Sequence, residues 1–393
     1  MHLDFARTLP DDADQAVLIG RLWLPEVGPV LVAHHEGALF DLSRLAATCS
    51  QLLEHEDPAA AVRAALPAAP RIASLADVLA NSDTSEGAPH DSTLPRLLAP
   101  CDLQVVKASG VTFIASLLER VIEEQARGDP LKAQDIRAAL AGILGDDLAG
   151  IVPGSPAAER VKQALIARGA WSQYLEVGIG PDAEVFTKAP LLSSVGTGAQ
   201  IGILAKSEWN NPEPEIVLTV NSRGRTVGAT LGNDVNLRDF EGRSALLLGK
   251  AKDNNASCAI GPFIRLFDAG FGIADVRQAE VSLLVEGRDG FSMPGSSSLA
   301  RISRDPLDIV AQTINANHQY PDGFVLFLGT MFAPTKDRRG PGLGFTHELG
   351  DVVQVATPRL GTLVNRVNHC DRIEPWNFGV TALMRNLAQR GLL

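Results

Sequence analysis

The sequence has few of the features that mark secreted, membrane-embedded or nucleic-acid-binding proteins. Its four cysteines (Cys49, Cys101, Cys258 and Cys370) are far apart and form no CxxC pair, which argues against a disulfide framework or a zinc site and favours a reducing compartment such as the cytoplasm. No apolar run approaches the roughly 20 residues of a membrane span, and the first residues lack the pattern of a signal peptide. The net charge of −11, without a cluster of Lys and Arg, argues against a general nucleic-acid-binding protein.

The composition is that of a globular protein with a substantial core. The 393 residues are 45% hydrophobic and 21% charged, and this length suits one large domain with a smaller one. Strand patterns and one helical pattern over residues 45–67 fill the first 72 residues. The stretch 74–95 follows, rich in Ser, Asp, Pro and Gly at its centre, and we interpret it as a linker or surface excursion. We therefore expect an α+β protein, with a small N-terminal α/β domain and linker over residues 1–95 and a larger domain over residues 96–393.

The larger domain begins with helical patterns and continues mostly as strands. Apolar residues recur at helical spacing from Val111 to Arg127, and Gly128 and Pro130 end this predicted helix. A further helical segment over about 129–170 is a candidate lid or oligomer contact, and the sequence does not decide between them. Beyond Trp171, short runs of Val, Ile and Leu alternate with Gly, Asn and Asp turns, which is typical of β-structure.

The stretch EPEIVLTVNSRGRTVGATLGND, from Glu213 to Asp234, has the pattern of a β-hairpin. A loop of two residues at Arg223–Gly224 or of four residues at Ser222–Arg225 gives the same register, with Glu213 opposite Asp234. Glu215 then lies opposite Gly232, where the missing side chain leaves space. Because side chains alternate along a strand, the two glutamates share a face, and directly opposed Cβ atoms are about 5 Å apart. Three carboxylates should thus converge at the base of the hairpin.

Three adjacent carboxylates suggest a site for a divalent cation. Their mutual repulsion would raise their pKa values unless a cation neutralises them, and oxygen-only ligation suits Mg²⁺, Mn²⁺ or Ca²⁺. The alternative is that these charges at the end of a strand are simply solvated. A β-bulge in the hairpin would shift the pairing by one residue and weaken the metal-site hypothesis.

The residues around the hairpin resemble a known superfamily. The pattern P-E-x-E, then G-N-D-x-N-x-R-D, then the lysine of GKAKDNNASCAIGPF resembles the fumarylacetoacetate hydrolase superfamily over about Ser109 to Val367. The resemblance is closest to its dehydratases of 2-keto-3-deoxy-pentonates such as 2-keto-3-deoxy-D-xylonate. It implies a mixed, curved β-sheet roll with helices outside, a catalytic domain over residues 96–393 and a homodimer or homotetramer. It also implies Glu213, Glu215 and Asp234 as ligands of a divalent metal, most simply Mg²⁺.

The same resemblance assigns roles to further residues. It implies Lys252, rather than Lys250, and Glu184 as catalytic residues, although either could be an ordinary surface residue. A lysine near a divalent cation in a closed pocket should have a lowered pKa and could act as a base. The resemblance also suggests substrate-binding roles for three residues that could instead be structural: Arg238, Thr330 and Lys188.

Histidine distinguishes between two branches of this superfamily. Its hydrolases activate water with a His–Glu pair that precedes the metal glutamates, but this sequence has no histidine between His90 and His318. We therefore expect a metal-dependent dehydratase that converts a 2-keto-3-deoxy-pentonate to 2-oxoglutarate semialdehyde, with a small-molecule partner and neither nucleic acid nor membrane. The alternatives are a C–C bond hydrolase or decarboxylase of an acylpyruvate-type 2-oxo acid, and a non-enzymatic metal-binding or scaffold protein. The C4 stereochemistry of the substrate stays open.

Overall fold

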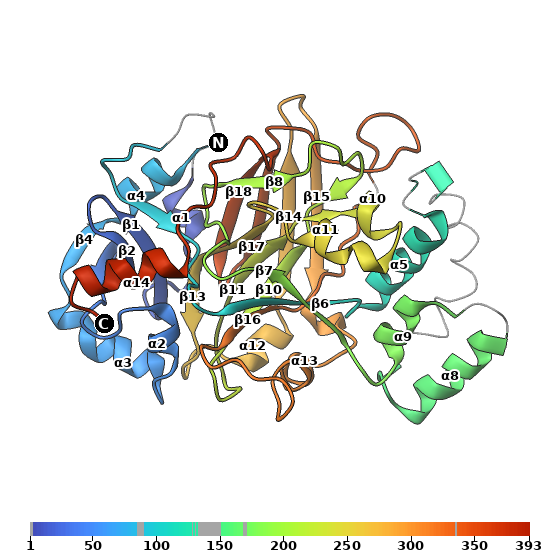
Figure 1. Cartoon of the computed structure of the whole chain (residues 1–393), viewed down its shortest axis with the longest axis horizontal. Coiled ribbons are helices and arrows are strands. Elements are labelled where there is room, and N and C mark those ends of the chain that lie inside the picture. Colours follow the sequence, from blue (N-terminus) through green and yellow to red (C-terminus); the bar gives the residue numbers. More distant parts are fainter. Residues whose placement is uncertain are drawn as a thin grey trace.

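The computed structural model describes residues 3–84, 90–127, 129, 131–132, 151–167, 171–334 and 336–393. Two mixed β-sheets form the centre of the protein and helices lie around them, with the N-terminal elements at one end and α5 (Ile114–Ala126), α8 (Pro156–Ala167) and α9 (Gln173–Ile179) at the other (Figure 1). The predicted α+β class is confirmed. In the described part of the chain, no helix has the length and apolar character needed to cross a bilayer.

The larger sheet has eleven strands in the part of the chain that is described, in the order β4-β3-β2-β1-β13-β11-β10-β16-β6-β7, with β5 paired to β1. Its β16–β6 pair is parallel and its other pairs are antiparallel. The strands are β1 (Leu18–Leu24), β2 (Gly28–His35), β3 (Ala38–Asp41), β4 (Arg71–Ser74), β5 (Arg96–Leu98), β6 (Val105–Gly110), β7 (Glu184–Ala189), β10 (Pro214–Val220), β11 (Thr226–Asp234), β13 (Cys258–Leu266) and β16 (Phe324–Phe327).

A smaller sheet packs against the larger one, in the order β15-β14-β17-β18-β8. Buried and exposed residues alternate along β14, and its buried Val281, Leu283 and Val285 join Ile216 and Leu231 of the larger sheet in one apolar core. The strands are β8 (Gln200–Ile203), β14 (Glu280–Glu286), β15 (Ser292–Ser298), β17 (Val352–Thr357) and β18 (Gly361–His369), and a separate short pair is β9 (Asn210–Asn211) with β12 (Asn236–Leu237).

The remaining helices lie around the sheets and at the N-terminal end. They are α1 (Phe5–Thr8), α2 (Cys49–Leu53), α3 (Pro58–Ala65), α4 (Leu75–Ser82), α10 (Arg238–Glu241), α11 (Leu248–Lys252), α12 (Ile273–Arg277), α13 (Pro306–Thr313) and α14 (Val380–Gln389), with the 3₁₀ turns η1 (Leu66–Ala68), η2 (Ala245–Leu247) and η3 (Leu299–Arg301).

The N-terminal strands extend the sheet that carries the hairpin. Strand β1 pairs with β13, and Ile19 lies opposite Ile264. At the other end of the chain, α14 returns to this region, where Asn386 Nδ2 donates to Val27 O at 2.6 Å (Figure 1). One sheet therefore runs across both parts of the chain, and the boundary near residue 95 stays a prediction.

Two local expectations for the N-terminal part were wrong. The helical pattern over residues 45–67 is not one helix, because Asp57 caps a new helix, α3, that starts with Pro58. The first half of the predicted linker is helix α4, capped by Ser74, and residues 85–89 lie outside the described residues. Helix α5 confirms the helix predicted from residue 111, while most of the predicted helical segment 129–170 lies outside the described residues.

Candidate active site

The base of the hairpin has the predicted register. In the β10–β11 pair, Pro214 lies opposite Asn233 and Glu215 opposite Gly232, and Asp234 N donates to Glu213 O at 3.0 Å. The expected space at Gly232 does not exist, because a Cβ atom there would meet the ring of Phe327. The pairing predicted for the carboxylates is thus confirmed, but Gly232 allows the Phe327 ring to pack closely and leaves no free space.

The tip of the hairpin differs from both predicted loops. Asn221 N donates to Arg225 O at 3.0 Å, which leaves a three-residue loop with Gly224 at a φ of +75°. Val220 then pairs with Thr226, and an irregularity between Thr219 and Val220 adds one residue to the β11 side of the ladder. The three-residue loop shifts the pairing by one residue, and the bulge shifts it back. The register at the base is therefore the one that a loop of two or four residues without a bulge would give.

Three buried carboxylates converge at the base of this hairpin. Glu213, Glu215 and Asp234 each offer an oxygen, and these oxygens lie within 4.8 Å of one another. Among the described residues this is the one group of at least three acidic, His or Cys side chains that close together. A set of carboxylate oxygens at this spacing fits a hard divalent cation.

Each of these carboxylates also has an oxygen held by the surrounding protein. Arg120 Nη2 donates to Glu213 Oε1 at 2.6 Å, and Gly329 N donates to Glu215 Oε2 at 2.6 Å. Lys188 Nζ lies 2.7 Å from Asp234 Oδ1. Such supporting contacts orient the ligands of metal sites, so the donor set is both chemically suitable and fixed in place.

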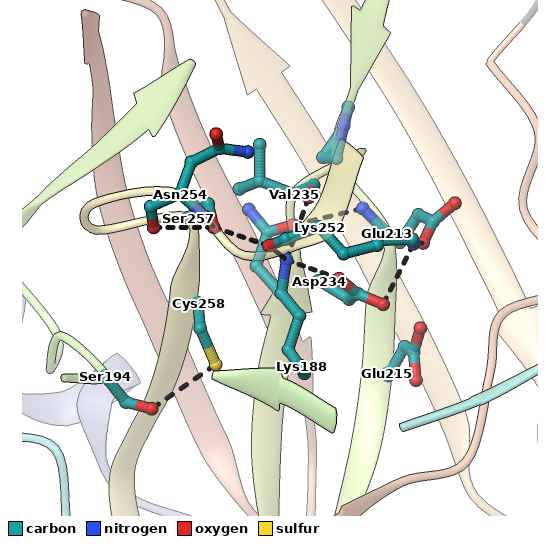
Figure 2. Close-up of polar contacts among 12 residues, drawn as sticks. Lys188, Ser194, Glu213, Glu215, Asp234, Val235, Lys252, Asn254, Ser257 and Cys258 are labelled. Carbon is teal, nitrogen blue, oxygen red and sulfur yellow. Dashed lines mark hydrogen bonds and ion pairs between the residues drawn. The ribbon is translucent and has the colours of Figure 1, made fainter. Parts of the chain in front are cut away.

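Lys252 is the last residue of α11, and its ammonium lies between two of the carboxylates. Its Nζ donates to Glu213 Oε2 and, at 3.0 Å, to Asp234 Oδ2 (Figure 2). Its backbone carbonyl accepts from Ser257 Oγ at 2.7 Å and from Lys188 Nζ at 2.5 Å. Lys252 is therefore a buried residue of the acidic cluster, and its side chain and its backbone are both fixed.

The charges in this cluster shift the protonation of its members. Burial raises the pKa of Glu213, but the charges of Lys252 and Arg120 outweigh it and bring the pKa down to about 2. Burial and the charges of Asp234 and Glu213 raise the pKa of Glu215 well above its usual range. Burial alone would lower the pKa of Lys252, but the surrounding carboxylates raise it above its usual range. The lowered pKa that the sequence analysis expects for Lys252 is therefore not produced by the protein's own side chains.

Glu184, the first residue of β7, lines the same pocket. It lies opposite Gly110 of β6, and a Cβ atom at that glycine would collide with the Glu184 carboxylate. Burial, reinforced by the charge of Glu241, raises the pKa of Glu184 to about 7, although Arg120 and Lys252 act in the opposite direction. A carboxyl group with this pKa can hold a proton near neutral pH.

The three predicted substrate-binding residues take different positions. Arg238 and Thr330 are buried residues that line the pocket. The Arg238 guanidinium lies over the Trp209 ring, 5.3 Å from its centre, and Thr330 Oγ1 accepts from Phe332 N at 3.1 Å. Lys188 lies behind Asp234, is fully buried and is not among the lining residues (Figure 2).

Several residues that line the pocket are not predicted from the sequence: Ser116, Glu119, Arg120, Phe186, Glu241 and Phe332. The first three lie on α5, where Leu117 and Val121 face the core. The helical periodicity that placed those apolar residues also defines an opposite polar face, and that pattern could have drawn attention to Arg120. Nothing in the spacing indicated that Glu241 or the two aromatic residues would reach the pocket.

Known proteins share sequence with this chain. The family model described as fumarylacetoacetate (FAA) hydrolase C-terminal matches residues 172–368, half of the chain. The 2-dehydro-3-deoxy-D-arabinonate dehydratase of Saccharolobus solfataricus is 32% identical over 186 residues, 47% of this chain and 58% of that protein. A probable 2-keto-3-deoxyxylonate dehydratase of Haloferax volcanii is 31% identical over 194 residues, 49% of this chain and 63% of that protein. The chain thus matches about three fifths of the length of these relatives.

Solved structures share the fold at lower identity. A 2-keto-3-deoxy-D-arabinonate dehydratase in its apo form has a TM-score of 0.58 at 22% identity, covering 90% of this chain and 99% of that one. The form complexed with magnesium and 2,5-dioxopentanoate has a TM-score of 0.58 at 21% identity, with the same coverage. A fumarylacetoacetate hydrolase from Exiguobacterium antarcticum has a TM-score of 0.53 at 20% identity, covering 90% and 100%. Together with the matching family model, the shared fold leads to one conclusion: the chain belongs to the fumarylacetoacetate hydrolase family.

Proposed function

We propose that the protein is a divalent-metal-dependent dehydratase that converts a 2-keto-3-deoxy-pentonate, most simply 2-keto-3-deoxy-D-xylonate, to 2-oxoglutarate semialdehyde. The observation that carries this proposal is the common pocket of a triad of acidic ligands, Lys252 and Glu184. The two curated relatives named above are dehydratases of this substrate class, and a neighbour of the same fold was solved with magnesium and 2,5-dioxopentanoate.

Glu213, Glu215 and Asp234 would hold the divalent ion, with Mg²⁺ the first choice and Mn²⁺ or Ca²⁺ as alternatives. When bound, such an ion would polarise the 2-oxo group of the substrate and make the hydrogens on C3 more acidic. The contacts of Lys188 with Asp234 and of Gly329 with Glu215 support two of these three carboxylates.

Lys252 would remove the proton from C3. Lys252 lines the pocket, and its neutral amine is the form that accepts a proton. The negative charges of Glu213 and Asp234 favour the ammonium instead. Lys252 can therefore act as a base only when other cations engage these two carboxylates.

Glu184 would donate the proton that the leaving group needs. As the C3–H bond breaks, the C4–O bond breaks as well, and the hydroxyl group takes the Glu184 proton and leaves as water. The 3-ene-5-hydroxy acid that remains rearranges to the terminal aldehyde by moving hydrogens, so no oxidant or reductant is required. A pKa of about 7 suits an acid that must hold its proton at neutral pH.

Arg238 and Thr330 would bind the substrate, because both line the pocket. The substrate-binding role of Lys188 stays a prediction, and its contacts with Asp234 Oδ1 and Lys252 O favour support of the site from behind. Among the described residues that line the pocket there is no histidine, which speaks against the hydrolase alternative. The homo-oligomeric state and the cytoplasmic location belong to the same proposal.

The test uses the purified protein after removal of bound ions with a chelator. With Mg²⁺ restored, 2-keto-3-deoxy-D-xylonate and its D-arabinonate-derived stereoisomer are compared, and the aldehyde product is followed by NMR. We expect semialdehyde from at least one stereoisomer and none without the ion. Turnover of an acylpyruvate with no semialdehyde from either stereoisomer would instead establish the hydrolase alternative.

A further inference from the structure

We propose that Arg120 is a positioning residue of this site, which fixes the orientation of Glu213 and joins it to Glu241. The inference deepens the proposed function, since it rests on Glu213 being a ligand of the divalent ion. Lys188 and Gly329 hold the other two carboxylates, and Arg120 holds Glu213 from helix α5.

The guanidinium of Arg120 connects two carboxylates that lie far apart in the sequence. Its Nη2 donates to Glu213 Oε1 at 2.6 Å, and its Nη1 donates to Glu241 Oε2 at 2.7 Å. The Arg120 side chain is 13% exposed, and the two carboxylate side chains are 7% and 5% exposed. Two short ion pairs in a nearly closed environment are stronger than surface pairs, because solvent screens them little.

The position of Arg120 is set by the packing of its helix. Leu117 and Val121 of α5 are buried in a cluster with Leu175 of α9. On another side of the helix, Ile122 and Ala126 pack against Trp209. Apolar contacts on two sides thus fix the position of α5, and with it the position from which the Arg120 guanidinium reaches the two carboxylates.

This arrangement leaves one carboxylate oxygen of Glu213 for the rest of the cluster. With Oε1 held by Arg120, the Oε2 atom is the one that accepts from Lys252, which also donates to Asp234. Lysine could not reproduce the contact, because a single ammonium lacks the planar fork that reaches two separate carboxylates. The same guanidinium holds Glu241, whose charge acts on the neighbouring Glu184.

The experiment measures binding of Mg²⁺ and Mn²⁺ alone, by isothermal titration calorimetry on the whole chain. We expect Arg120→Met to weaken ion binding 10- to 100-fold, as loss of a supporting contact to a metal ligand typically does. Arg120→Lys should recover part of the affinity, and Glu241→Gln should weaken binding by less than Arg120→Met. Arg265→Met is the matched control, since it removes another buried arginine that pairs with a carboxylate far from the pocket, and it should leave ion affinity unchanged.

Steady-state kinetics supply a second readout that a merely structural role would not move. In Arg120→Met the ion concentration for half-maximal activity should rise by the same factor as the dissociation constant, and kcat at saturating ion should recover to within about 10-fold of the wild type. Ion affinity equal to the wild type in a folded Arg120→Met variant would overturn the proposal. If that variant does not fold, wild-type affinity in both Arg120→Lys and Glu241→Gln overturns it, and weakened affinity in both supports it.

The outcomes separate this inference from the proposed function. Wild-type protein that binds the ion but forms no semialdehyde contradicts the proposed dehydratase function. The calorimetry of the Arg120 variants then decides the role of Arg120 independently. Wild-type protein that forms semialdehyde, with an Arg120→Met variant of unchanged ion affinity, contradicts only the inference. Wild-type protein that binds no divalent ion contradicts both.

Discussion

Arg265 and Arg120 pair with carboxylates in very different surroundings. Arg265 of β13 forms a two-pronged pair with Asp12, at 2.5 and 2.7 Å, and also donates to Arg359 O at 3.0 Å. Arg120 enters a pocket where, among the described residues, six acidic side chains and three basic ones form the lining. Asp12 also lies 3.4 Å from Arg359 Nη2, so in this group two arginines face one carboxylate, whereas Arg120 belongs to a cluster with an excess of negative charge.

The difference separates charge that holds a fold together from charge that is available for chemistry. The carboxylate of Asp12 is already matched by two arginines and is not available to a ligand, so removal of Arg265 should affect stability alone. A crowded set of carboxylates shifts the pKa values of its members apart, from about 2 for Glu213 to about 7 for Glu184. Groups whose pKa values are separated in this way can serve as ligand, acid and base in one reaction.

The largest effect should come from Lys252→Met. This variant removes the only group proposed to take the C3 proton, so kcat should fall on the order of 10²- to 10⁴-fold while the protein stays folded by circular dichroism. Lys250→Met is the matched control, because Lys250 is exposed two residues earlier on the same helix. Equal activity of the two variants would show that the buried lysine has no catalytic role.

Glu184→Gln should have the next largest effect, with kcat falling on the order of 10²-fold. The proton-bearing form of Glu184 is present below its pKa of about 7 and is lost above it, so the wild-type rate should decline as the pH rises through 7. The variant cannot lose this proton, and its pH–rate profile should lack that decline. A profile with the same alkaline limb in both proteins would contradict the assignment of Glu184 as the acid.

Arg265→Met tests the other side of the comparison. It should lower the free energy of unfolding by about 2 kcal/mol, since it removes hydrogen bonds between charged groups, while kcat and ion affinity stay at wild-type values. The hydrogen bond from Arg265 lowers the pKa of Asp12, so this contribution is present above the ordinary aspartate pKa and is lost as the pH falls. Denaturant titrations at neutral and acidic pH should show that the difference in the free energy of unfolding between the wild type and Arg265→Met is smaller at acidic pH. An Arg265→Met variant with wild-type stability and impaired catalysis would show instead that Arg265 acts in the function of the protein and not in its stability.

The smallest effect is expected from Gly110→Ala. The new methyl group would push the Glu184 carboxylate aside, and because this carboxylate ends a flexible side chain we expect kcat to fall by only about 10-fold. Gly379→Ala is a suitable control, since a Cβ atom there meets no atom within 4 Å. Wild-type kinetics for Gly110→Ala would mean that the position of Glu184 is not critical.

The sequence allowed the hairpin part of the site to be predicted because that part is local. Alternation along strands and antiparallel pairing are enough to bring Glu213, Glu215 and Asp234 together, and the structure has this register. Lys252 and Glu184 followed only from the family resemblance, because the turns that bring them to the pocket have no regular period.

The rest of the site depends on tertiary packing that no local pattern encodes. Arg120 reaches Glu213 across 93 residues of chain because α5 is wedged against α9 and Trp209. The same limit applied to the fold, where nothing in the spacing showed that β1 would pair with β13 in a common sheet. Hydrophobic patterns located these elements, but they carry no information about which distant element will be the neighbour.

The irregular tip of the hairpin has a consequence for the evolution of the protein. Its three-residue loop and its bulge each displace the pairing by one position, and together they restore it. A change of loop length that keeps the pair flanking the loop leaves this register unchanged. Loss of the extra β11 residue at the bulge would instead shift the pairing by one position and place Glu213 and Glu215 on the opposite face from Asp234, unless a second change in the same ladder restored the register.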